Sequence, residues 1–472
     1  MSSPERVNVA FMASEEDRLS QSGMAKGHRP AASLNLILPS PGHWGAPGRS
    51  QQHGQREAVA TPLVPATPRR PWQLAYLERK GTPTSQIEQH KLEESLFQLL
   101  IEEKKEGEKN KKFVTDFKTL TDVLVQEVIK HDIGKKFPGL EKNIDGEESN
   151  EFTNELGEKV IVKVCPTEQE TAVLLSVVLD GNEAASRALA KVVHQDIAFE
   201  DPALDKVDVD IPQSIMGIWV DPIDSTYQYI KGLSDVKPHH GIFPTGLQCV
   251  TILIGVYDIN TGLPLMGVVN QPFTTQDPNT LSWKGQCYWG ISYLNANFHS
   301  LPQPTFPGTN DNKPNGDCPK MLGKGSGDMQ TKVHRFSVVT STGEAEEIRT
   351  ALSDICKESL YFAAGAGYKS LCVILGLADV YIFSDDTTFK WDSCAPHAVL
   401  MSLGGGMVDW KTCVAKIRQG QNAQNLPQVL YNVEVEGATG ADRWANKGGI
   451  VAYRSKKHLE DLLNLLVRKL TV

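Results

Sequence analysis

The sequence predicts an α/β protein of two domains preceded by an N-terminal extension. The chain has 472 residues, more than one hydrophobic core usually organises. Strand-like and helix-like patterns alternate between residues 336 and 403, which is typical of an α/β domain. An apolar segment, residues 215–220, ends at Asp221, and α/β proteins place their functional sites at the carboxyl ends of strands.

Composition excludes several classes of protein. The net charge of −9 leaves no broad basic surface, so nucleic acid is not an expected partner. The eight cysteines are scattered without a Cys-x-x-Cys pair, which favours reduced thiols in a cytoplasmic protein. The longest apolar stretch, residues 242–256, is interrupted by proline, glycine and polar residues, so it predicts buried strands and no membrane span.

Residues 1–84 differ in composition from the rest of the chain. They are rich in proline, glycine, glutamine and serine, and they offer too little apolar surface to offset the entropy of an ordered chain. We expect a disordered leader.

The first folded domain is expected over residues 85–330. Ser85 and Glu88 form a capping box ahead of a helical pattern, and the charged stretch 102–112 predicts a solvated loop. A second helix follows at 122–131. The later elements are strands at 157–166, 215–220, 247–257 and 264–270, and helices at 167–180 and 182–193.

A long surface loop separates the two domains. Residues 298–331 are rich in proline, glycine, asparagine and aspartate, as expected near a domain boundary. The second domain, residues 331–472, begins with alternating elements. Strands are predicted at 336–341, 359–362 and 378–383, and helices at 343–353, 367–375 and 393–403.

The hexapeptide 221–226, with the sequence DPIDST, points to metal chemistry. Pro222 cannot donate a ladder hydrogen bond, so it directs the chain out of the sheet. The turn can then aim the carboxylates of Asp221 and Asp224 and the carbonyl of Ile223 at one volume. Oxygen ligands of this kind suit a hard divalent cation such as Mg²⁺. A structural turn with an aspartate cap is an equally good explanation of this motif alone.

The end of the same hexapeptide favours a phosphate. Ser225 and Thr226 lie where a helix can begin, at Tyr227 onward. The free N–H groups and the positive dipole end of a helix start attract anions. The hexapeptide therefore predicts metal ligands beside an anion site.

Other acidic residues carry weaker signals when each is taken alone. Glu147 and Glu148 follow a glycine in a polar loop, where adjacent carboxylates commonly face water. Asp122 lies early in a predicted helix, and Asp392 precedes one, so capping explains both of them.

The ordered set of Asp122, Glu147-Glu148, the hexapeptide 221–226 and Asp392 is more specific. It resembles the signature of the magnesium-dependent, lithium-sensitive phosphomonoesterases, the family of inositol monophosphatase and fructose-bisphosphatase. The likeness extends from about residue 94 to the end of the chain, and the proline-rich leader departs from it. Three longer segments support it: residues 96–105, 389–395 and 442–449.

This resemblance implies a layered α-β-α-β-α sandwich whose two domains meet at the metal site. It implies that Glu147, Asp221 and the Ile223 carbonyl hold one Mg²⁺, while Asp221, Asp224 and Asp392 hold a second. Glu147 would also touch a third, looser ion. Inhibition by Li⁺ follows from the same likeness.

The resemblance assigns two further sets of residues. Asp122 and Thr226 orient and deprotonate the attacking water, Glu147 is catalytic as well as a ligand, and Glu148 lies near the ions. Lys369 is the first candidate to contact a second phosphate, although a helix lysine with its ammonium in solvent is the alternative. The remaining substrate contacts are Asp224, Ser225, Thr226, Ser341, Thr342, Gly365 and Ala366.

The implied activity is removal of the 1-phosphate from inositol 1,4-bisphosphate and inositol 1,3,4-trisphosphate, in the turnover of phosphatidylinositol signals. The enzyme is expected to be a monomer whose partners are small inositol polyphosphates. A bisphosphate 3'-nucleotidase is the enzymatic alternative. A non-catalytic inositol phosphate binder is the alternative of another class.

Overall fold

The computed structural model describes residues 101–105, 107–112, 116–154, 156–195, 201–279, 283–302, 336–421 and 426–470. It also describes the backbone of β1 (Arg6–Asn8), which pairs with β7 (Asp210–Pro212). The rest of the predicted leader 1–84, the predicted helix start at Ser85 and most of the predicted loop 298–331 lie outside the described residues.

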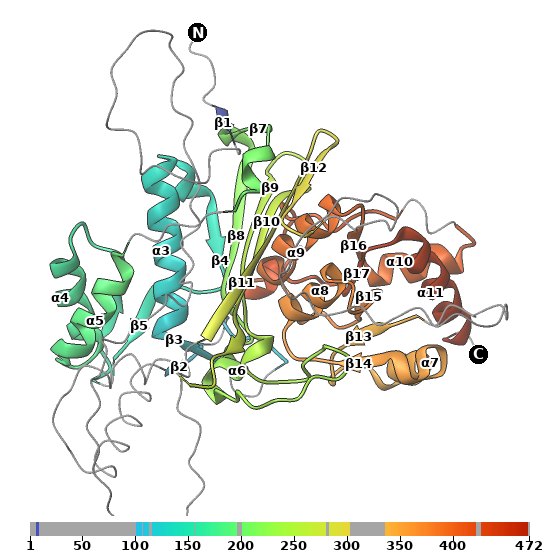
Figure 1. The fold of residues 1–472 in the computed structure, drawn as a ribbon, viewed down its shortest axis with the longest axis horizontal. Coiled ribbons are helices and arrows are strands. Elements are labelled where there is room, and N and C mark those ends of the chain that lie inside the picture. The colour runs from blue at the N-terminus through green and yellow to red at the C-terminus, as the bar shows by residue number, and fades with distance from the viewer. Residues whose placement is uncertain are drawn as a thin grey trace, which may run out of the picture.

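Helices and sheets alternate in layers across the molecule (Figure 1). Helix α3 covers one side of a six-stranded sheet, and α8 and α9 lie between that sheet and a five-stranded sheet. Helices α7, α10 and α11 lie beyond the second sheet. The predicted α-β-α-β-α sandwich is therefore confirmed.

The six-stranded sheet has the order β12-β11-β10-β9-β8-β4. Only the pairing of β4 with β8 is parallel, and the other neighbours are antiparallel. Its strands are β4 (Ile144–Gly146), β8 (Met216–Asp224), β9 (Thr251–Asp258), β10 (Pro264–Gln276), β11 (Trp283–Tyr293) and β12 (Ala296–His299).

The five-stranded sheet has the order β14-β13-β15-β17-β16. Strands β13, β14 and β15 are parallel, whereas β17 runs antiparallel to both of its neighbours. Its strands are β13 (Val338–Thr340), β14 (Leu360–Phe362), β15 (Val380–Phe383), β16 (Gly406–Asp409) and β17 (Ile450–Tyr453).

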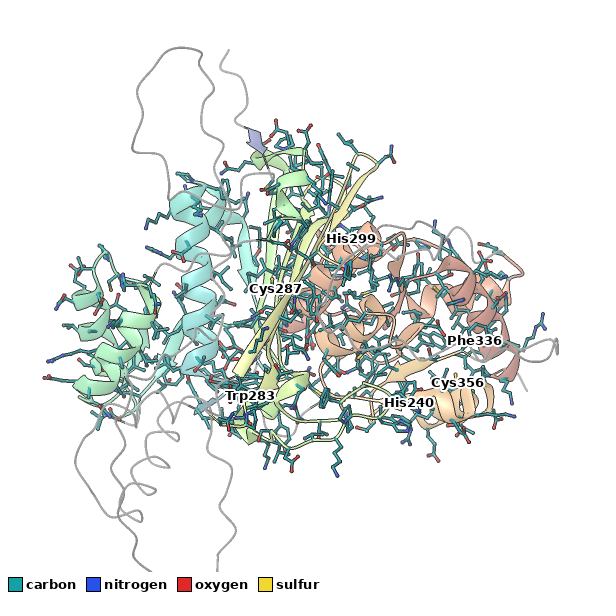
Figure 2. All side chains as sticks on the ribbon, in the orientation of Figure 1. His240, Trp283, Cys287, His299, Phe336 and Cys356 are labelled. Atoms are coloured by element: carbon teal, nitrogen blue, oxygen red, sulfur yellow. The ribbon has the colours of Figure 1, made fainter. Side chains whose placement is uncertain are left out.

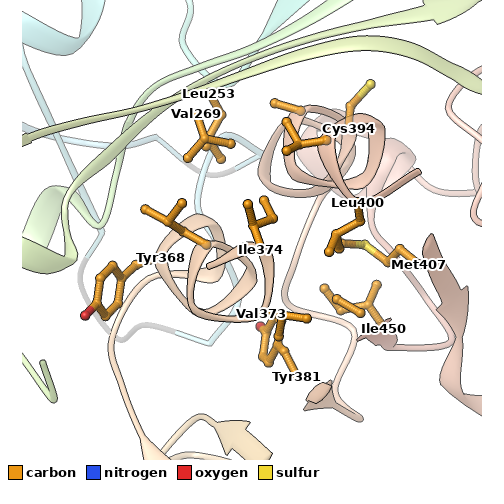
Figure 3. Close-up of a cluster of buried hydrophobic side chains, with 14 of the residues drawn as sticks. Leu253, Val269, Tyr368, Val373, Ile374, Tyr381, Cys394, Leu400, Met407 and Ile450 are labelled. Carbon is orange, nitrogen blue, oxygen red and sulfur yellow. The ribbon is translucent and has the colours of Figure 1, made fainter. Parts of the chain in front are cut away.

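The two middle helices are α8 (Ala366–Ile374) and α9 (Lys390–Ser402). Every residue of α8 is buried, because sheets cover the layer on both sides. Figure 3 shows the result: Leu253 and Val269 of the first sheet, Ile374 of α8 and Met407 of the second sheet lie in one apolar cluster. The two sheets thus share a core.

A row of three glycines lets α9 approach the first sheet. Gly255, Gly267 and Gly290 are register partners on β9, β10 and β11. A Cβ atom on Gly255 would lie 2.5 Å from the backbone nitrogen of Ala395, and one on Gly267 would collide with the Ala395 carbonyl. Only hydrogen at these positions permits this distance between helix and sheet. The row fixes the depth of α9 and so the position of Asp392 in its first turn.

The outer helices follow from ordinary capping and burial signals. Thr119 and Asp122 form a capping box at the start of α3, and Thr167 and Glu170 form another at the start of α4. The helices are α3 (Leu120–Lys136), α4 (Glu168–Val178), α5 (Glu183–Val193), α6 (Thr226–Lys231), α7 (Glu346–Cys356), α10 (Trp410–Arg418) and α11 (Lys456–Lys469). Two small hairpin sheets complete the fold: β2 (Ile101–Glu103) with β3 (Phe117–Thr119), and β5 (Glu151–Thr153) with β6 (Lys159–Ile161).

Most elements predicted from sequence are present. The helix at 122–131 lies within α3, and those at 167–180 and 182–193 correspond to α4 and α5. The strand predicted at 157–166 is shorter, because β6 covers Lys159–Ile161 only. The solvated loop predicted at 102–112 is wrong at its start, because residues 102 and 103 belong to strand β2 and Lys104 is 3% exposed where it enters the acidic site.

Candidate active site

The prediction that the chain leaves the sheet at Pro222 is wrong: β8 continues through Pro222 to Asp224, and only Ser225 lies between this strand and α6. The pairing of β8 with β9 shifts register between Asp221 and Asp224.

The side chain of Ile223 packs in a small apolar cluster with Trp283. Figure 2 shows Trp283 near α6. The carbonyl of Ile223 accepts a 3.1 Å hydrogen bond from Thr226 Oγ1. Apolar burial of this side chain thus holds the polar atoms of the hexapeptide at the site.

Three carboxylates from two layers of the fold converge at the end of β8. Asp221, Asp224 and Asp392 each offer an oxygen, and these oxygens all lie within 4.8 Å of one another. Asp221 is 1% exposed, and its Oδ1 has no hydrogen-bond partner in the described part of the chain. A buried carboxylate oxygen without a partner is costly, and a divalent cation would compensate it. The donor set therefore fits Mg²⁺.

Burial and mutual repulsion govern the ionisation of these groups. Burial raises the pKa of Asp221 well above its usual range, and the charges of Glu147, Asp224 and Asp392 raise it further. Burial, followed by the charges of Asp224 and Glu147, likewise raises the pKa of Asp392. Without a cation the site thus favours protons, which metal binding would displace.

Asp224 is held more firmly than its neighbours. Its Oδ2 accepts hydrogen bonds from Thr251 Oγ1 at 3.0 Å and from the Gly367 N–H at 2.9 Å. The Ala366 N–H donates to Oδ1 at 3.3 Å. Because Ala366 and Gly367 begin α8, the positive end of that helix faces the carboxylate. Burial raises the pKa of Asp224, and Lys369 and these hydrogen bonds oppose the increase.

Asp392 occupies the third position of α9. Its Oδ2 accepts a 2.5 Å hydrogen bond from the Phe389 N–H, so it also serves the capping role that was the alternative. Asn446, 4% exposed, supports this helix start because its Nδ2 donates to the Phe389 carbonyl at 2.9 Å. Capping and membership of the acidic cluster are therefore both present.

Glu147 and Glu148 do not face water as a solvated pair. Lys104 Nζ lies 2.6 Å from Glu147 Oε1 and 2.7 Å from Glu148 Oε1. Burial opposes the charge of Lys104, but the two glutamates raise its pKa well above the usual value. Glu147 lines the same cavity as the three aspartates, although it is not part of the 4.8 Å cluster. Glu148 is 6% exposed and does not line that cavity.

Asp122 lies beside the hexapeptide at the start of α3. One carboxylate oxygen accepts from the Thr119 N–H at 2.6 Å, and the other lies 3.5 Å from Thr226 Oγ1. Burial raises the pKa of Asp122 to about 7, and hydrogen bonds from Thr119 limit that increase. The predicted pair of Asp122 and Thr226 is thus brought together at the site.

The predicted substrate residues line one cavity of about 400 Å³, which also contains the three aspartates. This volume lies in the range of small-molecule sites. Gly365 has φ of +77°, and a Cβ there would lie 2.8 Å from Ser225 Oγ and 2.9 Å from Asp224 Oδ2. Glycine is therefore required where the backbone approaches the acids. Around the cavity lie Ser225, Thr226, Ser341, Thr342, Gly365, Ala366 and Lys369.

Lys369 is not a lysine that reaches solvent from a helix surface. It is 5% exposed, its Nζ donates a 2.6 Å hydrogen bond to the Gly365 carbonyl, and it lies 5.2 Å from the centre of the Tyr381 ring. Burial lowers its pKa to about 8. The solvent-exposed alternative considered from sequence is therefore wrong.

Sequence reasoning missed several residues at or next to this site, among them Lys104, Asn446 and Thr251. Lys104 belongs to a charged stretch that looks solvated, and Asn446 has no local signal. Thr251 could have been recognised from sequence, because it is a polar residue inside the apolar strand predicted at 247–257.

Comparisons with known proteins identify the family of this chain. The model of the inositol monophosphatase family matches residues 125–459. Over 378 residues the chain is 64% identical to inositol polyphosphate 1-phosphatase of Bos taurus, covering 80% of this chain and 92% of that protein. The protein of the same name from Homo sapiens is 63% identical over 378 residues with the same coverage. The 3'(2'),5'-bisphosphate nucleotidase 1 of Homo sapiens is 24% identical over 326 residues, covering 67% of this chain and 79% of that protein.

No helix among the described residues has both the length and the apolar character needed to cross a membrane. The family model spans most of the chain, from residue 125 to residue 459, and this chain belongs to the inositol monophosphatase family.

Proposed function

We propose that this chain is a magnesium-dependent inositol polyphosphate 1-phosphatase. It would remove the 1-phosphate from inositol 1,4-bisphosphate and inositol 1,3,4-trisphosphate in the turnover of inositol signals. The observation that carries the proposal is the meeting of Asp221, Asp224 and Asp392 within 4.8 Å beside a cavity of about 400 Å³. The two mammalian relatives of that name, at 63% and 64% identity, support the choice of substrate.

The oxygens at the acidic end of the cavity would hold the metal. Asp221, Asp224 and Asp392 form the centre, and Glu147 and the Ile223 carbonyl extend it toward a second ion and a third, looser one. When bound, magnesium supplies positive charge that lowers the pKa of water and stabilises the leaving oxygen. Glu148 contributes through Lys104, which it shares with Glu147.

The pair of Asp122 and Thr226 would position the attacking water and accept its proton. The Thr226 hydroxyl can donate to Asp122 Oδ1 or to the Ile223 carbonyl, and its lone pairs remain available to a water molecule. Asp122 has a pKa of about 7 because burial raises it, so it can accept a proton near neutral pH.

The other residues that line the cavity would bind the substrate. Ser225, Ser341 and Thr342 supply polar groups, and Gly365 allows close approach of the backbone. The Lys369 ammonium adds positive charge that suits a phosphate.

We also infer inhibition by Li⁺, a cytoplasmic location and a monomeric state. Family likeness supports the first. The seven cysteines in the described part of the chain are free, as a reducing compartment favours.

A phosphate-release assay tests the proposal. Inositol 1,4-bisphosphate, inositol 1,3,4-trisphosphate and an adenosine 3',5'-bisphosphate would be compared with and without Mg²⁺ and Li⁺. We expect Mg²⁺-dependent release from the inositol phosphates and inhibition by Li⁺. Faster release from the nucleotide would favour the nucleotidase, and binding without release would favour a non-catalytic binder.

A further inference from the structure

Two lysines face the substrate cavity without an acidic partner. Among the described residues that line it, the cationic side chains are Lys112 and Lys369. Neither forms an ion pair with a carboxylate of the described chain within 4.0 Å, whereas the nearby Lys104 and Lys111 both do. The sequence resemblance assigns no role to Lys112, which belongs to the stretch first predicted to be solvated.

Lys112 is held in place by the loop that carries it. Its neighbour Asn110 donates from Nδ2 to the Thr387 carbonyl at 3.0 Å, and Lys111 Nζ pairs with Asp386 at 2.7 Å. The Lys112 N–H donates to Asn110 Oδ1 at 3.0 Å. These contacts tie the residues that precede Lys112 to the segment before α9, and so they fix where the Lys112 backbone lies.

The Lys112 ammonium lies beside the turn that begins at Ser341. Its Nζ is 4.3 Å from the centre of the Phe383 ring. It would lie 3.3 Å from a Cβ atom placed on Gly343, so the ammonium lies directly against that turn. Gly343, Ser341 and Thr342 all line the cavity. A cation, two hydroxyl groups and backbone therefore meet at one wall.

The two ammonium groups are close enough to repel each other. Burial lowers the pKa of Lys369, the charge of Asp224 opposes that effect, and the charge of Lys112 adds to it. Burial likewise lowers the pKa of Lys112, while Asp385 and Glu344 oppose that effect. Both ammonium groups are partly desolvated and lack a direct ion pair in the described chain, so a bound phosphate could accept charge-assisted hydrogen bonds from them.

We propose that Lys112, together with Lys369 and the turn at residues 341–343, binds a phosphate other than the one being hydrolysed, and that Lys112 thereby selects polyphosphorylated inositol. The inference rests on the proposed function and adds a residue that determines specificity. Lysine suits this role because its ammonium is a mobile point charge with three donors.

Inhibition by the two reaction products tests this subsite and the metal site independently. In hydrolysis of inositol 1,4-bisphosphate, inorganic phosphate reports on the metal end, and inositol 4-phosphate reports on the second-phosphate wall. For Lys112→Gln we expect the inhibition constant of inositol 4-phosphate and the KM of the bisphosphate to rise together by about 10- to 100-fold. The inhibition constant of inorganic phosphate should change less than about threefold.

A lysine outside the cavity provides a matched control. Lys142 is exposed and does not line the cavity, so Lys142→Gln should leave all three constants near the wild-type values. Lys112→Arg, which keeps the charge, should recover part of the affinity for inositol 4-phosphate and also guards against misfolding of the glutamine variant.

The inference is overturned if Lys112→Gln weakens both inhibitors equally, or leaves inositol 4-phosphate binding unchanged. Those outcomes are distinct from failure of the proposed function, in which the wild-type protein itself would release no phosphate from inositol 1,4-bisphosphate.

Discussion

The hydroxyl of Thr251 donates a 3.0 Å hydrogen bond to Asp224 Oδ2, and both residues are buried. The bond fixes the rotation of a carboxylate that belongs to the acidic cluster. We expect Thr251→Val, which is nearly isosteric, to raise the Mg²⁺ concentration for half-maximal activity about 10-fold, since hydrogen bonds to charged groups contribute about 1.5–3 kcal/mol. Magnesium titration of phosphate release measures this change.

Thr171 provides the control for that variant. It is fully buried, and its hydroxyl accepts a 3.0 Å hydrogen bond from the Cys165 N–H, remote from the acidic cluster. Thr171→Val should lower stability without changing the Mg²⁺ requirement. A similar Mg²⁺ shift in both variants would mean that Thr251 matters only for folding.

Asp221 should be indispensable for activity and yet unfavourable for stability in the absence of metal. Its pKa is raised by burial and by three neighbouring carboxylates, so replacing it with Asn removes repulsion. We expect Asp221→Asn to lose more than about 1,000-fold in turnover and to bind Mg²⁺ weakly. Its melting temperature in EDTA should equal or exceed that of the wild type.

The exposed Asp354, which pairs with Lys469 at 2.6 Å, gives a matched substitution. Asp354→Asn should change neither turnover nor Mg²⁺ binding. Wild-type turnover by Asp221→Asn would eliminate its role in the metal centre.

Gly267→Ala should push α9 away from the first sheet. The added methyl group collides with the backbone carbonyl of Ala395, which cannot move without the helix. We expect a loss of about 1–3 kcal/mol in the free energy of unfolding and a higher Mg²⁺ requirement, because Asp392 moves with α9. Chemical denaturation and magnesium titration measure the two effects. Unchanged values for both would show that the helix adjusts freely.

Stabilisation by magnesium should increase with pH between about 6.5 and 8. Burial raises the pKa of Asp122 to about 7 and that of Glu148 to about 8 in the folded protein. In the unfolded chain these groups titrate near about 4. At these two carboxyl groups the folded protein therefore holds more protons across this window, and without metal their contribution to stability falls as pH rises. Burial lowers the pKa of Lys369 and Lys390 to about 8, which has the opposite sign at the upper end of the window.

Thermal denaturation in EDTA and in saturating Mg²⁺ gives the comparison at each pH. Burial lowers the pKa of His397 to about 4, so the contribution of His397 makes stability rise with pH. That contribution no longer changes above about pH 6.5, where His397 is neutral in both the folded and the unfolded chain. A melting-temperature gain from Mg²⁺ that is constant across the window would contradict the expectation.

The acidic centre could be predicted largely from sequence because its ligands carry local signals. The hexapeptide 221–226 follows an apolar strand, and its proline marks the register shift between Asp221 and Asp224 at the end of β8, so this local irregularity could be expected from sequence. The sequence evidence for Asp392 as a metal ligand is weaker, because a position at a helix start also explains an aspartate there. Only the ordered set of acidic residues indicates that Asp392 belongs to the site.

The residues that sequence missed depend on distant partners. Lys104 lies in a run of charges, and its burial is decided by Glu147 and Glu148, more than 40 residues later. The position of α9 depends on glycines from three strands, and no single one of them signals a contact. Such features follow from packing between layers, which local patterns do not specify.

The helical layer shared by the two sheets has a consequence for how this chain can be divided. Residues of both sheets and of α8 and α9 form one continuous apolar cluster (Figure 3). A premature stop before α9 would leave the inner face of the first sheet without cover, and the product would aggregate. Neither sheet, with the helices of its own part of the chain, can therefore be expected to fold as an independent domain.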